Sequence, residues 1–179
     1  MPLGTIAPGF NLPDPVSGTT ISLDDIKSDK ATVVMFICNH CPYVKAVRER
    51  LVRDTLELKA LGINSVAIMS NDPSQYEEDS LENMGRVARQ FGFPFPYLLD
   101  ETQDVAKAYE AVCTPDFFGY NADLSLQYRG RLDESRKETA PEGVRRDLFE
   151  AMKQVAETGS GPKEQVPSMG CSIKWTSES

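Results

Sequence analysis

The stretch Cys38-Asn39-His40-Cys41-Pro42 decides the fold, because it joins two segments whose side chains follow different patterns. Residues 32–37, just before it, are apolar on both faces and rich in β-branched side chains, which is typical of a strand buried in a sheet. Residues 43–61, just after it, repeat apolar side chains at helical spacing and end at Gly62. The sequence therefore predicts that the two cysteines lie on a turn between a buried strand and a helix.

Two thiols at this spacing can form a small disulfide ring or share a metal ion. The unpaired N–H groups and the dipole of a helix N-terminus favour negative charge, and so lower the pKa of a thiol placed there. Because the thiolate is the form that attacks disulfides, this position favours redox chemistry. We expect Cys38 to be the exposed thiol of low pKa, with Cys41 one helical turn further in.

The composition limits the kinds of protein that this chain can be. With 179 residues, 40% of them hydrophobic, the chain can bury one domain. Its net charge of −8 disfavours a nucleic acid or an anionic membrane as a partner, since both require a basic surface. The N-terminal residues lack the pattern of a secretory signal, so we expect a cytoplasmic protein. Four cysteines are too few for a disulfide-stapled scaffold, which makes a reactive role for the pair more plausible in a reducing compartment.

The first half of the chain continues with alternating strand and helix patterns. Turn residues between short segments in 1–30 predict an N-terminal hairpin. Residues 64–69 predict a second buried strand, parallel to the first because a helix connects them. Ser74 and Glu77 are spaced as a capping box. The remaining patterns indicate a helix over 81–91, a short strand over 96–100 and a short helix over 102–110.

The second half has the pattern of an antiparallel hairpin followed by a helix. Residues 116–120 and 124–129 are strand-like and flank a turn. Residues 139–142, Thr-Ala-Pro-Glu, predict the start of a helix that runs to Gly159. We therefore expect one domain over 1–158 and a C-terminal tail over 159–179 that packs on it.

This order of segments resembles the thioredoxin fold, an α/β fold in which helices flank a central mixed sheet. The pattern Ala7-Pro8-x-Phe10-x-Leu12 resembles the N-terminal hairpin of alkyl-hydroperoxide-reductase-like redoxins, and the helix around 80–91 resembles their inserted helix. Thr114-Pro115 is similar to the cis-proline turn of the family. The nearest sub-group is the cytoplasmic "thioredoxin family protein" set, which carries Cys-Asn-His-Cys-Pro and a tail like Gly170–Trp175.

The resemblance implies a thiol-disulfide oxidoreductase that acts on protein or small-molecule disulfides and is recharged by a reductant that the sequence does not identify. It assigns catalysis to Cys38 and Cys41, with support from Asn39, His40 and Pro42, and substrate binding to Thr114 and Pro115. A cationic His40 would stabilise the thiolate and raise the reduction potential. The buried Asp that accepts a proton in thioredoxin is replaced by Thr32, so the resemblance leaves the proton acceptor unassigned. No cofactor is expected.

Two alternative functions stay open at this point. A peroxiredoxin-like peroxidase would need Pro-x-x-x-Thr/Ser-x-x-Cys, and neither cysteine of the pair is preceded by that pattern. A zinc or copper protein could bind its ion through Cys38, His40 and Cys41, with Cys113 or Cys171 as the fourth ligand.

Cys113 and Cys171 are candidate accessory thiols, which the thioredoxin pattern does not require. Cys113 directly precedes Thr114, and Cys171 lies in an alternating segment of the tail that should dock on the domain. Both cysteines can be ordinary buried apolar side chains. Alternatively, the tail brings Cys171 within exchange distance of Cys113 or Cys41, where it would form a second couple that relays electrons or protects against over-oxidation.

Overall fold

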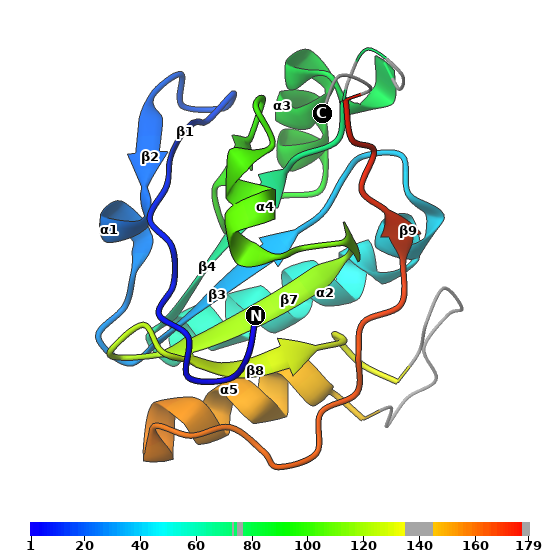
Figure 1. The fold of residues 1–179 in the computed structure, drawn as a ribbon. Coiled ribbons are helices and arrows are strands. Elements are labelled where there is room, and N and C mark those ends of the chain that lie inside the picture. The colour runs from blue at the N-terminus through cyan, green and yellow to red at the C-terminus, as the bar shows by residue number, and fades with distance from the viewer. Residues whose placement is uncertain (73, 75–76, 135–144, 177–179) are drawn as a thin grey trace.

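The computed structural model describes residues 1–72, 74, 77–134 and 145–176. Its centre is a five-stranded sheet with the strand order β5-β4-β3-β7-β8 (Figure 1). In that order the strands are Tyr97–Leu99, Ile63–Met69, Ala31–Phe36, Asp116–Asn121 and Leu126–Gly130. β3, β4 and β5 run parallel, whereas β7 is antiparallel to both β3 and β8. The predicted fold class, a central mixed sheet flanked by helices, is confirmed.

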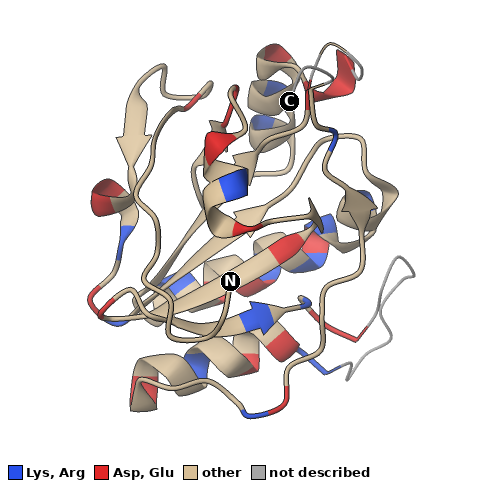
Figure 2. Ribbon diagram, in the orientation of Figure 1, with Lys and Arg blue, Asp and Glu red and all other residues tan. Residues whose placement is uncertain are grey.

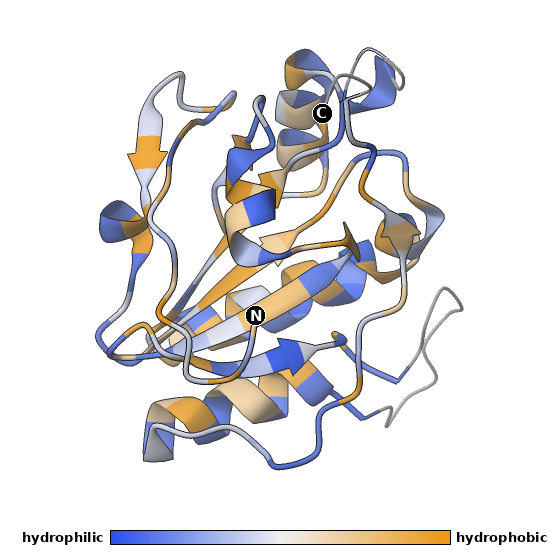
Figure 3. Cartoon of the chain, in the orientation of Figure 1, coloured by the Kyte–Doolittle hydropathy of each residue, from blue (hydrophilic) through white to orange (hydrophobic). Residues whose placement is uncertain are grey.

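The middle strand β3 is buried along its whole length, as its apolar sequence predicts. Figure 3 shows that β3 and β4 carry the hydrophobic colour through the centre of the molecule. The one polar side chain of β3, Thr32, is fully buried and accepts a hydrogen bond from the N–H of Ser28 at 2.9 Å. A strand with both faces apolar needs a covering layer on each side, and the helices provide it.

Helices cover both faces of the sheet. α2 (Pro42–Ala60) and α5 (Asp147–Thr158) pack on one face, where Leu51, Leu58 and Met152 share a core with α3 (Leu81–Gln90). α4 (Asp104–Tyr109) and the N-terminal segment cover the other face, around a cluster of aromatic rings: Phe36, Tyr109, Phe118 and Tyr120. Figure 2 shows that the charged residues lie mainly on the helices and loops, while most of the sheet is uncharged.

The N-terminal hairpin is present as predicted. β1 (Asn11–Pro13) pairs antiparallel with β2 (Thr20–Ser22). The short helix α1 (Leu23–Ile26) follows at once, because Ser22 and Asp25 satisfy each other's backbone N–H groups in a capping box. None of the helices that the structure describes is both long and apolar enough to cross a lipid bilayer.

Two local predictions need correction. The predicted cap at Ser74 is wrong, since its hydroxyl donates to Asp72 at 2.7 Å, and α3 is instead capped by Ser80 after the 3₁₀ turn η1 (Glu77–Asp79). The predicted helix start at 139–142 lies outside the described residues. The described helix α5 begins at Asp147, and Arg145 and Arg146, just before it, are not helical.

The tail runs back along the sheet towards the cysteine turn. Residues 159–170 pass beside β8, where the N–H of Arg131 donates to the carbonyl of Val166 at 3.0 Å. The tail strand β9 (Cys171–Ser172) then pairs antiparallel with β6 (Cys113–Thr114), as Figure 1 shows. Ile173, next in the chain, is only 2% exposed. The second half of the tail is therefore anchored to the domain by both hydrogen bonds and apolar burial.

Candidate active site

The two cysteines occupy the predicted turn between β3 and α2. Cys41 is the N-cap of α2, and Pro42 takes the first helical position. An N–H at that position has no partner within the helix, so the lack of one in proline costs no helical hydrogen bond. Both side chains are buried, since Cys38 is 2% exposed and Cys41 is not exposed at all. The prediction of an exposed Cys38 is wrong, because the turn that carries Thr114 packs directly on its sulfur.

Thr114 contacts both sulfur atoms of the pair. Its hydroxyl lies 3.4 Å from Cys38 Sγ, and its carbonyl accepts a hydrogen bond from Cys41 Sγ at 3.4 Å. Cys38 Sγ also accepts from the backbone N–H of Cys41 at 3.3 Å. The peptide bond between Thr114 and Pro115 is cis, as predicted. The structure thus brings the predicted catalytic cysteines and the predicted substrate-binding turn together.

The two thiols titrate as a coupled pair. The hydrogen bond that the Cys38 thiol donates to Cys41 and burial raise the pKa of Cys38, and the negative charge of Asp79 adds to the effect. The same hydrogen bond lowers the pKa of Cys41 to about 4 against the opposing effect of burial. The low pKa thus falls on Cys41, contrary to the prediction for Cys38. The reason is that the two sulfurs hold one proton between them. The position of a cysteine along the helix does not reveal which sulfur keeps that proton.

A buried carboxylate, Asp79, lies beneath the cysteine turn and was not found from the sequence. It accepts hydrogen bonds from the backbone N–H of Asn39 at 2.7 Å and from the side-chain amide of Asn71 at 3.1 Å, and it pairs with Nδ1 of His40. Asp79 is fully buried. It stands in a polar loop without a motif, so its sequence context carried no signal for this role.

The supporting residues hold the turn in place. The side-chain oxygen of Asn39 accepts from the hydroxyl of Tyr97 at 2.9 Å, and its amide donates to the carbonyl of Glu78 at 2.7 Å. With its backbone N–H bound to Asp79, Asn39 ties the turn to both β5 and η1. Such fixed hydrogen bonds preorganise a site.

The cluster could also hold a metal ion, though not with the predicted ligand set. One ligand atom each from Cys38, His40 and Asp79 lies within 4.8 Å of the others. The predicted set had Cys41 and a remote cysteine in place of Asp79. Thiolate, imidazole and carboxylate are all ligands that Zn²⁺ accepts. To bind such an ion, His40 and Asp79 would have to exchange their mutual hydrogen bond for bonds to the metal.

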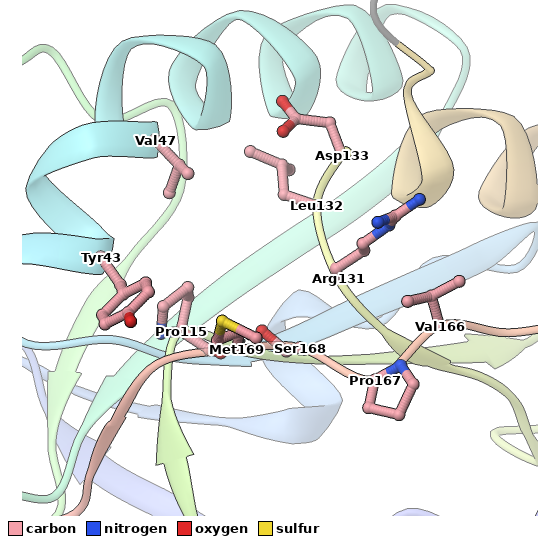
Figure 4. A pocket seen from close by; sticks show the side chains of 10 residues that line it. All are labelled: Tyr43, Val47, Pro115, Arg131, Leu132, Asp133, Val166, Pro167, Ser168 and Met169. Atoms are coloured by element: carbon pink, nitrogen blue, oxygen red, sulfur yellow. Dashed lines mark hydrogen bonds between the residues drawn. The ribbon is translucent and has the colours of Figure 1, made fainter. Parts of the chain in front are cut away.

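An apolar groove of about 330 Å³ opens beside the cysteine turn. Figure 4 shows it between the first turns of α2, which contribute Tyr43 and Val47, and the segment 166–169 of the tail. Pro115 forms part of its wall. Because Thr114 links this wall to the two sulfurs, the groove can receive an apolar side chain of a molecule bound at the site.

The fold and the cysteine turn together are those of the thioredoxin-like superfamily. Residues 3–134 match the profile described as "AhpC/TSA family", and the chain belongs to this family. No match is found among the curated proteins.

Solved structures extend the likeness to almost the whole chain. An uncharacterized conserved protein from Geobacillus kaustophilus is 51% identical, with a TM-score of 0.93 and coverage of 98% of this chain and 93% of that one. A hypothetical protein from Sinorhizobium meliloti 1021 is 41% identical, with a TM-score of 0.93 and coverage of 99% and 96%. A thiol:disulfide interchange protein from Chlorobium tepidum TLS shares the fold at 20% identity, with a TM-score of 0.64 and coverage of 87% and 99%.

Proposed function

We propose that this protein is a thiol-disulfide oxidoreductase in which Cys38 and Cys41 alternate between a dithiol and a disulfide. The observation that carries the proposal is the pair of cysteines at the start of α2, in which Cys38 Sγ accepts from the N–H of Cys41 and Thr114 contacts both sulfurs. Such a pair supplies one thiolate at neutral pH and a second thiol that can close the disulfide.

The reaction proceeds by two exchanges of sulfur partners. Cys38, which has the only measurable exposure of the two, attacks one sulfur of the substrate disulfide, and the other substrate sulfur leaves as a thiolate. Cys41 then attacks Cys38 Sγ, which forms the Cys38–Cys41 disulfide and releases the remaining substrate thiolate. Two electrons pass from the dithiol to the substrate. When Cys38 attacks as the thiolate, the proton shared by the two sulfurs stays on Cys41, and Cys41 must release it before the second exchange.

The pair formed by His40 and Asp79 is our proposed proton acceptor. Cys38, His40 and Asp79 lie within 4.8 Å of one another, whereas Thr32, at the position of thioredoxin's acidic residue, is engaged by Ser28. The imidazole takes the proton that the dithiol releases, and the carboxylate holds the ring and offsets its positive charge. This carboxylate also weakens the predicted effect of His40 on the reduction potential, because it neutralises the charge that would favour the thiolate.

The substrates we propose are protein or small-molecule disulfides, and the working compartment is the reducing cytoplasm. A disulfide with an apolar residue next to its cysteine fits the groove beside Pro115. A separate reductant must regenerate the dithiol after each cycle, since the two electrons leave with the substrate.

The test is disulfide reduction by the purified protein, with insulin and a small aromatic disulfide as substrates and dithiothreitol as the reductant. We expect turnover of wild-type protein, none with Cys38→Ser, and a mixed disulfide trapped at Cys38 in Cys41→Ser, identified by mass spectrometry. Turnover that survives Cys38→Ser would refute the proposal.

Two parallel measurements separate the alternatives. Consumption of hydrogen peroxide in place of disulfides would indicate a peroxidase, and stoichiometric zinc or copper in protein purified without reductant would indicate a metal protein. The arrangement of Cys38, His40 and Asp79 is what makes the metal analysis worthwhile.

A further inference from the structure

The tail strand occupies the backbone edge that the sequence assigned to substrate. Thr114 pairs with Cys171, and Cys113 pairs with Ser172. The hydroxyl of Ser168 donates to the carbonyl of Pro115, and the N–H of Ile173 donates to the carbonyl of Val112 at 3.1 Å. An extended substrate segment would need this same edge in order to add a strand beside the cysteines. The chain therefore places its own tail where a protein substrate would bind.

Gly170 makes this close approach possible. A Cβ atom at this position would lie 2.0 Å from the carbonyl oxygen of Thr114, which no packed side chain tolerates. The tail backbone thus lies directly against the residue that contacts both active-site sulfurs. A larger residue at position 170 would move the tail away from the site.

Strand alternation places the side chain of Cys171, but not that of Cys113, towards the active-site sulfurs. Residues directly opposite in an antiparallel pair place their side chains on the same face. Thr114 faces Cys38 Sγ, so its partner Cys171 faces the active-site sulfurs too. Cys171 packs against the core cluster that contains Cys41, and Cys41 Sγ donates to the carbonyl of Thr114, the residue that pairs with Cys171. Cys113 belongs to the other face, and its thiol donates to the carbonyl of Pro115 at 3.7 Å.

The surroundings of Cys171 also suit a sulfur that changes its bonding partner. Its side chain is half-buried and packs against the same core cluster as Tyr43 in the first turn of α2. Burial and the hydrogen bond with Cys41 raise the pKa of Cys171 to about 11, so this thiol keeps its proton while the dithiol is reduced. Exchange needs a disulfide to attack, so it follows the formation of the Cys38–Cys41 bond.

We infer that Cys171 is a third redox-active cysteine, which exchanges with the Cys38–Cys41 disulfide by attack on Cys41. This inference rests on the proposed function. The bond between Cys41 and Cys171 forms, the bond between Cys38 and Cys41 breaks, and Cys38 leaves with the electron pair and takes up the proton that Cys171 gives up. No electron is gained or lost overall, so the step needs no further oxidant.

The exchange has two consequences for the oxidised protein. Cys38 becomes a free thiol again, while the oxidising equivalent is stored in the Cys41–Cys171 bond. That bond also locks β9 onto Thr114, so an oxidised molecule cannot accept a second substrate strand until a reductant opens it. The tail is thus a tethered competitor of the substrate, and its thiol makes the competition depend on redox state.

Disulfide mapping of the oxidised protein tests the inference. We expect two species in wild-type protein, Cys38–Cys41 and Cys41–Cys171. Cys171→Ser should leave only the first, and mild oxidation of Cys38→Ser with oxidised glutathione should give the second. Cys113→Ser is the matched control and should give the wild-type mixture, because Cys113 lies on the other face of β6.

Displacement of the tail gives an independent measurement. Gly170→Ala should lower the yield of Cys41–Cys171 and speed the alkylation of the reduced pair, whereas Gly9→Ala, which has open space around it, should change neither. If Cys171 stays free in both wild-type and Cys38→Ser protein while Cys38–Cys41 forms normally, the inference is overturned and the proposed function stands. If Cys38–Cys41 itself never forms, the proposed function fails first.

Discussion

Asp54 and Asp79 are two fully buried carboxylates with opposite surroundings. Asp54, inside α2, accepts hydrogen bonds from Nη2 of Arg146 at 2.6 Å and from Nε of Arg53 at 2.9 Å. Asp79, in η1, is held by the amides of Asn39 and Asn71 and by His40. In the parts of the chain that the structure describes, no arginine or lysine is paired with Asp79.

Asp54 is a carboxylate that joins two helices, whereas Asp79 is a carboxylate that changes the ionisation of its neighbours. Burial raises the pKa of Asp54, but two guanidinium groups compensate its charge and thereby connect α2 to the start of α5. The charge of Asp79 is not compensated in this way, and it reaches Cys38, whose pKa it helps to raise. A buried charge without a permanent counter-ion costs stability, which is a reason to assign it a functional role.

Of the substitutions that test this comparison, one at Asp54 should have the largest effect, and that effect is on stability. Asp54→Asn should lower the free energy of unfolding by about 3 kcal/mol, because it leaves Arg146 without its buried partner. This is the low end of the usual range, since the side chain of Arg146 remains 24% exposed and water can solvate it. Urea denaturation measures the loss. The specific activity of the folded variant should match wild type, and a loss of activity in fully folded protein would remove the contrast with Asp79.

The next effect is on catalysis at Asp79. Asp79→Asn should slow disulfide reduction at neutral pH by roughly 100-fold, the lower end of the range for general acid–base catalysis, because it removes the carboxylate that holds His40 as the proton acceptor. The deficit should shrink as the pH rises, because hydroxide can then take the proton. Initial rates across a pH series provide the measurement, and thermal unfolding checks that the variant stays folded. An equal deficit at every pH would show that Asp79 only positions the turn.

A smaller effect concerns the ionisation of the reduced pair. Because the folded pKa of Cys41 is depressed to about 4, the thiolate exists above that pH and is lost as the pH falls through it. The ultraviolet absorbance of the thiolate should follow this curve in wild-type protein. In Cys38→Ala the midpoint should move towards the ordinary pKa of cysteine, since the hydrogen bond that lowers it most is gone. An unchanged midpoint would place the cause in the helix N-terminus instead.

The sequence alone predicted the elements whose cause is local. The uniform apolar pattern of residues 32–37 identified β3, and the helical spacing after Cys41 identified α2. These two features follow from periodicity. The cis turn at Thr114-Pro115 that meets the sulfurs was predicted from its resemblance to the cis-proline turn of the family. Where several conformations were open, as at Ser74 and at residues 139–142, local patterns gave wrong or untested boundaries.

Only the tertiary structure decided which groups surround the two sulfurs. Asp79 reaches the turn from 40 residues away in the sequence, and Cys171 reaches it through the pairing of β9 with β6. The burial of Cys38 and the division of one proton between two thiols depend on the same packing. The identity of a residue determines its chemistry and its local backbone preference. Its pKa and its reaction partners depend on burial and on distances between remote segments, which exist only once the chain has folded.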